Sequence, residues 1–436
     1  MRHVVRVLVL LVVGVVASLV GVVVALTVTP PGRALLARNV SHQLETLLRG
    51  RVNVGNIDGS FLRDLVLRDV VVRDTSGVLL VSLPVVRVRY LIPNFLARRF
   101  ILEALEVEHP IINLVRHASG RWNYEEVLRL SEGPPGRKSV PPLIEFRNMK
   151  LTDGALALAY PWPTGQLTAA QRDSQVAAVR AIPGRIVDDT EEGTRRVLTF
   201  SNLTTAIRRL RISTPDHLPL LVVVDTLNTD ASEPQLQLRQ LQGTIEQQGD
   251  SLRFSLARVA LPGTQATTEG MVSWPRDTIM WDFRASAPRL DLVDLRFISP
   301  EFPAMTGHAD IVAQSLSGRR TNYAVTSLVL VDGPERIEGR LVAEVDAVDG
   351  LGVRGLRLRL TELNLDKVRP YVDSLPFIGL ITGPVEADGD LNNIAAKGDI
   401  IFTDLAVPGR PMTTLTFDGR LQTGTGALVF DKVAIA

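Results

Sequence analysis

The hydrophobic positions of this chain follow three successive patterns. Residues 7–28 form an uninterrupted apolar run without a charged side chain. Residues 31–50 carry apolar side chains at helical spacing, and from residue 51 onward apolar and polar positions alternate. A period near 3.6 indicates an amphipathic helix, whereas a period of two indicates half-buried strands. The pattern therefore predicts a mostly β protein that begins with two helices.

The first 30 residues predict a transmembrane signal anchor. At about 1.5 Å per residue the apolar run spans roughly 33 Å, which is enough to cross a bilayer core. Arg2, His3 and Arg6 precede it and place the N-terminus in the cytoplasm. A cleaved signal peptide is the alternative, but the run is long for one and residues 25–27 make a poor cleavage site. The anchor positions include Val7, Leu10, Val20 and Val28.

Residues 31–50 predict an amphipathic helix. Leu36, Val40, Leu44 and Leu47 form one apolar stripe, and Gly50 stands where a helix stop is expected. We expect this stripe to pack on the β body, although a simple linker helix fits the pattern equally well.

Residues 51–160 predict a first β domain. Its apolar set shifts by one position between Leu67 and Val70, which predicts a β-bulge near Arg68 and Asp69. Residues 91–100 fit a crossover helix or a contact with lipid headgroups. Residues 144–160 predict a hairpin that turns at Asp153-Gly154. The apolar face of this domain includes Leu65, Leu67, Val70, Val72, Val86 and Val88.

Residues 161–196 interrupt the alternation. They combine a polar, Ala-containing helical stretch with the acidic run at residues 188–192. Adjacent carboxylates do not converge on one cation without a fixed loop, so this run predicts a solvated loop.

Residues 197–436 return to strands and contain a weak internal repeat. Leu290-Asp291-Leu292 recurs as Leu363-Asn364-Leu365, 73 residues later (363 − 290), each copy followed by a Gly-containing strand. Such repetition is typical of a β array, and the given chain could be part of a longer one. Three leucines alternate with arginines in this segment: Leu356, Leu358 and Leu360.

Composition and motifs argue against catalysis and against nucleic acid as a partner. Lys plus Arg is 48 and Asp plus Glu is 47, a net charge of +1, and there is no Cys. The six His residues form no metal-ligand pair, and no nucleophile or phosphate-loop motif occurs. Residues 350–355 match G-x-G-x-x-G, but alternating Leu and Arg follow where a helix would have to start, so we interpret them as a hairpin turn. The sequence thus predicts no enzyme, cofactor or metal site.

The alternation leaves each strand with one apolar and one charged face. A sheet with one apolar face must cover it with a second sheet, with helices or with a ligand. A sandwich or solenoid core is one solution, and a groove that holds lipid tails is the other. The predicted anchor favours the groove.

The N-terminal part resembles the AsmA-like proteins, including TamB. The resemblance is carried by the order of anchor, amphipathic helix and strands, and it is clearest over residues 1–160. Its motif positions are Gly59, Ser60, Gly120, Trp122, Asn123, Asp153 and Gly154.

The resemblance implies a transmembrane helix followed by an elongated, repeating β-sheet groove (a β-taco) with few short helices. It implies an inner-membrane protein whose body lies in the periplasm and carries phospholipid acyl chains between the two membranes. The TamB branch implies instead a scaffold for outer-membrane β-barrel assembly, with a barrel partner of the TamA type. The large C-terminal domain of TamB is not in this sequence, which leaves a truncated chain or a shorter AsmA-like branch as the alternatives.

Overall fold

The protein is mostly β, with few and short helices, as the alternation predicts. The computed structural model describes residues 51–60, 64–91, 99–117, 120–127, 143–162, 168–181, 185–190, 193–213, 218–233, 235–275, 278–315, 317, 319–346, 350–369, 378–390, 393–407, 410–411, 415–422 and 427–435. The predicted anchor and amphipathic helix lie outside these residues. Within them, no helix has the length and apolarity needed to cross a bilayer. The chain divides into two compact units, Met1–Gln248 and Gly249–Ala436.

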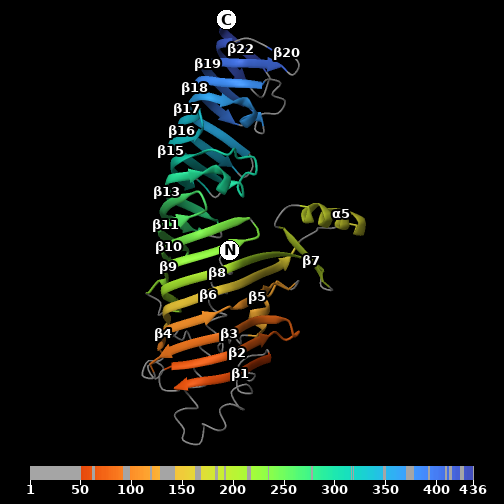
Figure 1. The fold of residues 1–436 in the computed structure, drawn as a ribbon, viewed down its shortest axis with the longest axis vertical. Coiled ribbons are helices and arrows are strands. Elements are labelled where there is room, and N and C mark those ends of the chain that lie inside the picture. The colour runs from red at the N-terminus through yellow and green to blue at the C-terminus, as the bar shows by residue number, and fades with distance from the viewer. Residues whose placement is uncertain are drawn as a thin grey trace, which may run out of the picture. The chain divides into compact units, whose positions relative to one another are not determined.

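The first unit contains ten strands among the described residues (Figure 1). They are β1 (Arg51–Ser60), β2 (Asp64–Arg73), β3 (Leu79–Tyr90), β4 (Arg99–Glu108), β5 (Ile111–Val115), β6 (Leu143–Pro161), β7 (Ile186–Thr190), β8 (Gly193–Ser213), β9 (Leu220–Ala231) and β10 (Leu236–Gln248). β4 and β5 follow each other along the same side of β3 and pair with β6 in parallel, while the other pairs are antiparallel. The sheet order is therefore β1-β2-β3-β4/β5-β6-β8-β9-β10.

Two helices accompany this sheet: α4 (Asn123–Val127) and α5 (Ala169–Arg180). The helical stretch predicted within residues 161–196 is confirmed as α5, which begins with a capping box between Thr168 and Gln171. β7 pairs with the start of β8, and Figure 1 shows β7 and α5 beside the sheet.

A line of irregular backbone crosses this sheet. Four residues other than glycine have φ between 49° and 53°: Asp69, His109, Asp153 and Asn202. They lie at matching levels of β2, the β4–β5 junction, β6 and β8. Positive φ is uncommon outside glycine, so four aligned cases form a structural feature of the sheet. We call this line the seam.

The seam keeps the apolar side chains on one face. In β2, Leu67 and Val70 are separated by two outward residues, yet both are at most 1% exposed and belong to one core. The predicted bulge at Arg68 and Asp69 is wrong in detail, because Arg68 and Val70 keep their partners on β1 and no residue is inserted. Asp69 reverses the alternation through its left-handed backbone, opposite Gly55.

The core of the first unit gathers apolar side chains from both sides of the seam. Trp122, Tyr124 and Val127 of the α4 segment join the strands there. The core strand residues include Val52, Leu65, Leu67, Val70, Val72, Leu80, Val81, Leu83, Val86, Val88, Tyr90, Leu102, Leu105, Val107, Ile112, Leu114, Phe146, Met149, Leu156, Leu158 and Leu210.

The second unit is an antiparallel ladder. Its strands are β11 (Ser251–Ala260), β12 (Gln265–Ser273), β13 (Met280–Asp291), β14 (Thr306–Ser315), β15 (Arg320–Asp332), β16 (Glu335–Asp346), β17 (Gly350–Asn364), β18 (Ile378–Asp390), β19 (Asn393–Val407), β20 (Arg410–Pro411), β21 (Leu415–Gln422) and β22 (Ala427–Ile435). Each strand from β11 to β19 pairs with the next, β20 and β21 both pair with β19, and β22 pairs with β21.

The predicted repeat is confirmed in the second unit. β13 runs into a 3₁₀ turn, η2 (Leu292–Leu295), and β17 runs into another, η3 (Leu365–Lys367). The side chain of Asp291 accepts a hydrogen bond from the Val293 amide, and that of Asn364 accepts one from the Asp366 amide. Leu292 and Leu365 are buried in the same apolar cluster. Equivalent residues therefore build the same strand-to-turn corner twice.

Three predictions of turns or loops are wrong. Asp153-Gly154 is not a hairpin turn but an irregular point inside β6, whose two halves both pair with β8. Residues 350–355 begin β17 and contain only a bulge at Gly355, where φ is +56°. In these two cases Gly and Asp mark breaks in the alternation, but the long strands β6 and β17 accommodate such breaks as bulges. Asp188 and Asp189, predicted in a loop, lie in β7, where they pair with Arg195 and Thr194 of β8.

Candidate functional site

The predicted groove residues of the first unit lie inside its core. Leu65, Leu67, Val70, Val72, Val86 and Val88 are each at most 2% exposed. The structure brings all six into one apolar cluster. In this unit the apolar face is therefore closed.

The predicted groove residues of the second unit are more accessible. Leu356 and Leu358 of β17 are half-buried, and Leu360 is 8% exposed. Leu360 belongs to the cluster under the 3₁₀ turns, together with Leu363 and Leu365. The apolar face is thus covered at the turn end of β17 and more open toward the middle of that strand.

A row of apolar and small side chains crosses seven strands of the second unit. Its members are directly opposite one another in successive pairs, and all except the buried Ala313 are half-buried. The row consists of Phe254, Gly270, Phe283, Ala313, Tyr323, Ala343 and Val353. With strands about 4.8 Å apart, the six steps of this row extend for roughly 29 Å.

A second row runs parallel to the first, two residues along each strand. It consists of Leu256, Thr268, Ala285, Ile311, Val325 and Leu341, all half-buried. We call the two rows together the apolar rows. Apolar chains of lipid could lie along such rows, because half-buried side chains still lose water when a ligand covers them.

The opposite face of the sheet carries charge. In the first unit it includes the buried Glu145, which is 3% exposed. Arg147 Nε lies 2.9 Å from its carboxylate and Arg211 Nε lies 3.1 Å away, with Arg209 at 3.7 Å. Burial raises the pKa of Glu145, but the hydrogen bonds from Arg147 and Arg211 outweigh it and hold the pKa below its ordinary value. Glu145 is therefore the shared ion-pair partner of three arginines on β6 and β8.

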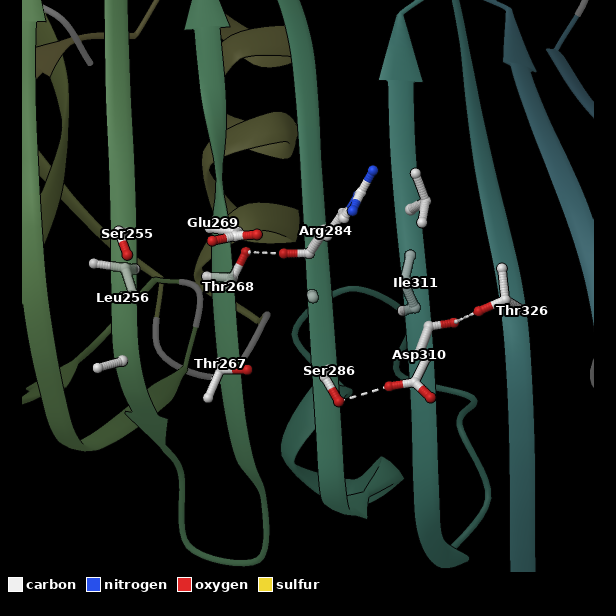
Figure 2. Close-up of a pocket in the computed structure, with 13 residues that line it drawn as sticks. Ser255, Leu256, Thr267, Thr268, Glu269, Arg284, Ser286, Asp310, Ile311 and Thr326 are labelled. Atoms are coloured by element: carbon white, nitrogen blue, oxygen red, sulfur yellow. Dashed lines mark hydrogen bonds between the residues drawn. The ribbon is translucent and has the colours of Figure 1, made fainter.

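A hollow of about 440 Å³ lies in the second unit (Figure 2). Its lining combines charged and hydroxyl residues with four members of the second apolar row: Leu256, Thr268, Ala285 and Ile311. Ser286 Oγ donates to Asp310 Oδ1 over 2.6 Å, and Thr268 Oγ1 donates to the Arg284 carbonyl over 2.8 Å. These bonds tie neighbouring strands together. Figure 2 shows Glu269, Arg284 and Asp310 on adjacent strands. The hollow therefore offers hydroxyl, carboxylate and guanidinium groups for polar contacts beside apolar side chains.

The motif residues of the N-terminal resemblance have structural roles. Asn123 is fully buried, accepts a hydrogen bond from the Val115 amide over 3.0 Å and donates to the Asn113 carbonyl over 3.1 Å. Trp122 forms an isolated β-bridge with Arg116. Gly59 and Gly120 have φ of +101° and +84°, which favour glycine. Asp153 at the seam lies 3.1 Å from His109.

Neither metal ligands nor known relatives point to another chemistry. In the part of the chain that the structure describes, no three His, Asp or Glu side chains are grouped so as to hold a metal ion. No protein-family model, curated protein or solved structure matches this chain. The apolar rows are the candidate site, because they are the largest set of half-buried apolar side chains described above that lie in register.

Sequence reasoning missed the apolar rows. In β17 it named Leu356, Leu358 and Leu360, whereas the row residue of that strand is Val353, and it named none of the row residues of β11 to β16. Their alternation is visible, as in Phe254-Ser255-Leu256, but small residues such as Gly270 and Ala313 weaken the apolar signal. The register between strands is what joins them into rows.

Proposed function

We propose that this chain is a membrane-anchored protein of the cell envelope that carries phospholipids along the apolar face of its β-sheet. The observation that carries the proposal is the pair of apolar rows, which cross at least six strands and remain half-buried. The apolar run at residues 7–28 and the resemblance to AsmA-like proteins support an inner-membrane anchor with the body in the periplasm.

The dimensions of the rows suit an acyl chain. One leaflet accounts for about half of the roughly 30 Å hydrocarbon core, so a lipid tail extends for about 15 Å. A row of about 29 Å could hold one tail while another enters or leaves. In the proposed arrangement the sheet forms a groove, with tails on the apolar rows and headgroups toward water.

The test uses two neighbouring residues that face opposite ways. Phe283 belongs to an apolar row, whereas Arg284 is exposed and stands opposite Glu269. A photo-crosslinking phenylalanine analogue is placed at position 283 or 284 of the full chain in a diderm bacterium. After irradiation, mass spectrometry should find phospholipid adducts at position 283 and few at position 284. Equal labelling, or none at position 283 and at Tyr323, would contradict the proposal.

A second candidate is a scaffold for outer-membrane β-barrel assembly, and sheet edges favour it. Among the described strands, β1 pairs only with β2 and β22 only with β21. An unpaired edge can accept a strand of another protein. Crosslinks from β22 to nascent barrel proteins or to a barrel partner of the TamA type, without phospholipid adducts at position 283, would favour this function.

A further inference from the structure

Three apolar side chains are exposed at the first of the two repeated corners. Val293 of η2 is 40% exposed, and in the loop that follows Phe297 is 37% exposed and Ile298 is 65% exposed. Among the exposed large apolar residues of the described ranges, Ile298 has the highest exposed fraction. Single exposed apolar residues are ordinary, but three within residues 293–298 form a patch. We call these three residues the apolar tip.

The loop that carries the apolar tip is held in place by hydrogen bonds and packing. The Ile298 amide donates to the Leu295 carbonyl over 2.8 Å. Leu295 packs against the apolar cluster that contains Leu292. The carboxylate of Asp294 accepts a hydrogen bond from the Gly263 amide over 2.8 Å, which joins the loop to the hairpin of β11 and β12. An ordered backbone therefore presents the apolar tip to solvent.

The exposed charges beside the apolar tip are mostly positive. Arg289 and Arg296 are exposed, and within the described residues neither forms an ion pair with a carboxylate. Asp291 and Asp294 are half-buried, and both accept hydrogen bonds from backbone amides. Glu301 is the exposed carboxylate of the loop. Two guanidinium groups and one carboxylate are thus the exposed charges of this corner.

The second corner has the same backbone but a polar surface. Asp366 occupies the position that Val293 has in the first corner, an offset of 73 residues (366 − 293), and Arg369 corresponds to Arg296 (369 − 296). Asp366 and Arg369 lie 3.1 Å apart, and their side chains are 57% and 46% exposed. Both corners nevertheless form a 3₁₀ turn after a long strand. The exposed valine of the first corner is therefore not required by its fold.

We propose that the apolar tip binds the surface of a phospholipid bilayer. Exposed Phe, Ile and Val side chains lower their contact with water when they enter the boundary between headgroups and acyl chains. Arg289 and Arg296 supply N–H donors and positive charge for the lipid phosphates. The predicted anchor at residues 7–28 holds the same chain at a membrane.

The size of the apolar tip favours a bilayer over a protein partner. The three side chains expose on the order of 250 Å² together. A stable protein interface buries about 800 Å² on each partner, which is several times more. A fluid bilayer needs no pocket of matching shape, so a small tip is sufficient for it. The apolar tip lies outside the apolar rows, and this proposal does not depend on lipid transport along them.

The test uses the absence of cysteine from the chain. In the full chain, Pro300→Cys is labelled with the environment-sensitive fluorophore nitrobenzoxadiazole, because Pro300 is exposed and lies next to the apolar tip. The labelled protein is reconstituted in vesicles of phosphatidylethanolamine and phosphatidylglycerol in equal amounts, and empty vesicles of the same lipids are added. Lipids with a spin label on the acyl chain are included in all vesicles and quench a fluorophore that enters the bilayer.

We expect the spin-labelled lipids to reduce the emission from position 300 by roughly twofold or more. The same label at Gln314→Cys is the control for position. Gln314 is exposed near the end of β14 that lies away from the corner, so its emission should not change.

Two substitutions in the apolar tip should remove most of the quenching at position 300. Ile298→Asn replaces the most exposed side chain, and Val293→Asp introduces the carboxylate that the second corner carries at this position. Both positions are exposed, so the urea midpoint should stay that of the natural chain. Ile279→Asn is the matched control, because Ile279 is 50% exposed but precedes β13, whereas the apolar tip follows it. It should leave the quenching unchanged.

Three results would overturn the proposal. They are no quenching at position 300, quenching at position 314 of equal strength, and quenching at position 300 that survives Val293→Asp. Val293→Asp decides the test if Ile298→Asn lowers the urea midpoint. An emission at position 300 that rises with protein concentration and is not quenched by the spin-labelled lipids would show that a second copy covers the apolar tip, and it also overturns the bilayer as its partner.

Discussion

The rings of Phe254 and Phe283 lie with their centroids 6.4 Å apart, although β12 runs between their two strands. Gly270 occupies the position between them in register. Without a side chain at Gly270, the two aromatic groups can meet above the strand that separates them. The first apolar row therefore begins with a large, a small and a large residue. The contact between the two large residues depends on the small size of Gly270.

Gly270→Ala should destabilise the second unit. A Cβ at this position would lie 2.4 Å from both the Asp282 carbonyl oxygen and Phe283 Cβ, so the backbone or the ring must move. We expect a loss of about 2 kcal/mol in the free energy of unfolding, measured by urea denaturation. Gly333→Ala is the control, since no atom lies within 4 Å and only its positive φ is unfavourable, at about 1 kcal/mol. Equal stability of Gly270→Ala and the natural chain would contradict this packing.

Glu145→Gln should destabilise the first unit at neutral pH by about 3 kcal/mol, because it removes the buried counter-charge of the half-buried Arg147 and Arg211. The folded-state pKa of Glu145 is lowered, so its contribution is present above the unfolded-state pKa and is lost as pH falls through the folded-state pKa. The difference in the free energy of unfolding between Glu145→Gln and the natural chain should therefore disappear below about pH 4. Urea denaturation at a series of pH values measures this difference.

The control for Glu145 is Glu106→Gln. Glu106 is exposed and lies 4.0 Å from Arg87, so its loss should change stability by less than about 0.5 kcal/mol. If the difference in the free energy of unfolding between Glu145→Gln and the natural chain stays constant down to about pH 2, the ionisation of Glu145 is not what stabilises the sheet.

Lys367→Met should loosen the corner at η3. Lys367 Nζ binds Asp332 and lies 2.9 Å from Glu335. It therefore joins the 3₁₀ turn to the hairpin between β15 and β16. Burial lowers the pKa of Lys367, but hydrogen bonds from its ammonium to Asp332 and Glu335 raise it above the ordinary value. This contribution is fully present below the unfolded-state pKa and is lost only as pH rises through the folded-state pKa.

We expect Lys367→Met to cost about 1 kcal/mol at pH 7, measured by urea denaturation. In the same variant, the amides of β17 and β18 should exchange their hydrogens faster than in the natural chain. Lys150→Met, at an exposed position of the first unit, is the control and should leave those amides unchanged. Unaltered exchange in Lys367→Met would show that the turn does not depend on this ion pair.

Asn123→Ala should weaken the junction between β5 and α4. The substitution leaves the Val115 amide and the Asn113 carbonyl without their side-chain partner. The expected loss is about 2 kcal/mol, since unsatisfied buried polar groups keep their desolvation cost. Asn53→Ala, exposed on β1, is the control. A thermal-unfolding difference below 0.5 °C (about the size of a surface substitution) between the two variants would contradict this role.

Local patterns were sufficient to predict several elements. The β domain over residues 51–160 is formed by β1 to β6, the helical stretch within residues 161–196 is α5, and the repeat at Leu290 and Leu363 recurs as a strand followed by a 3₁₀ turn. These features depend on side chains within a few residues, so the sequence displays them directly. The mistakes fell at Asp153 and residues 350–355, where local turn signals lie inside long strands.

The sequence by itself determined that the chain is mostly β, that each strand has an apolar and a charged face, and where the repeated corners fall. Only the tertiary structure decided that Leu65 and Val70 share a closed core while Leu356 stays half-buried. It also decided that Phe254 meets Phe283, and that Arg340 faces Arg357. The reason is register: strand partners are set by backbone pairing across long distances, and one inserted residue changes which side chains meet.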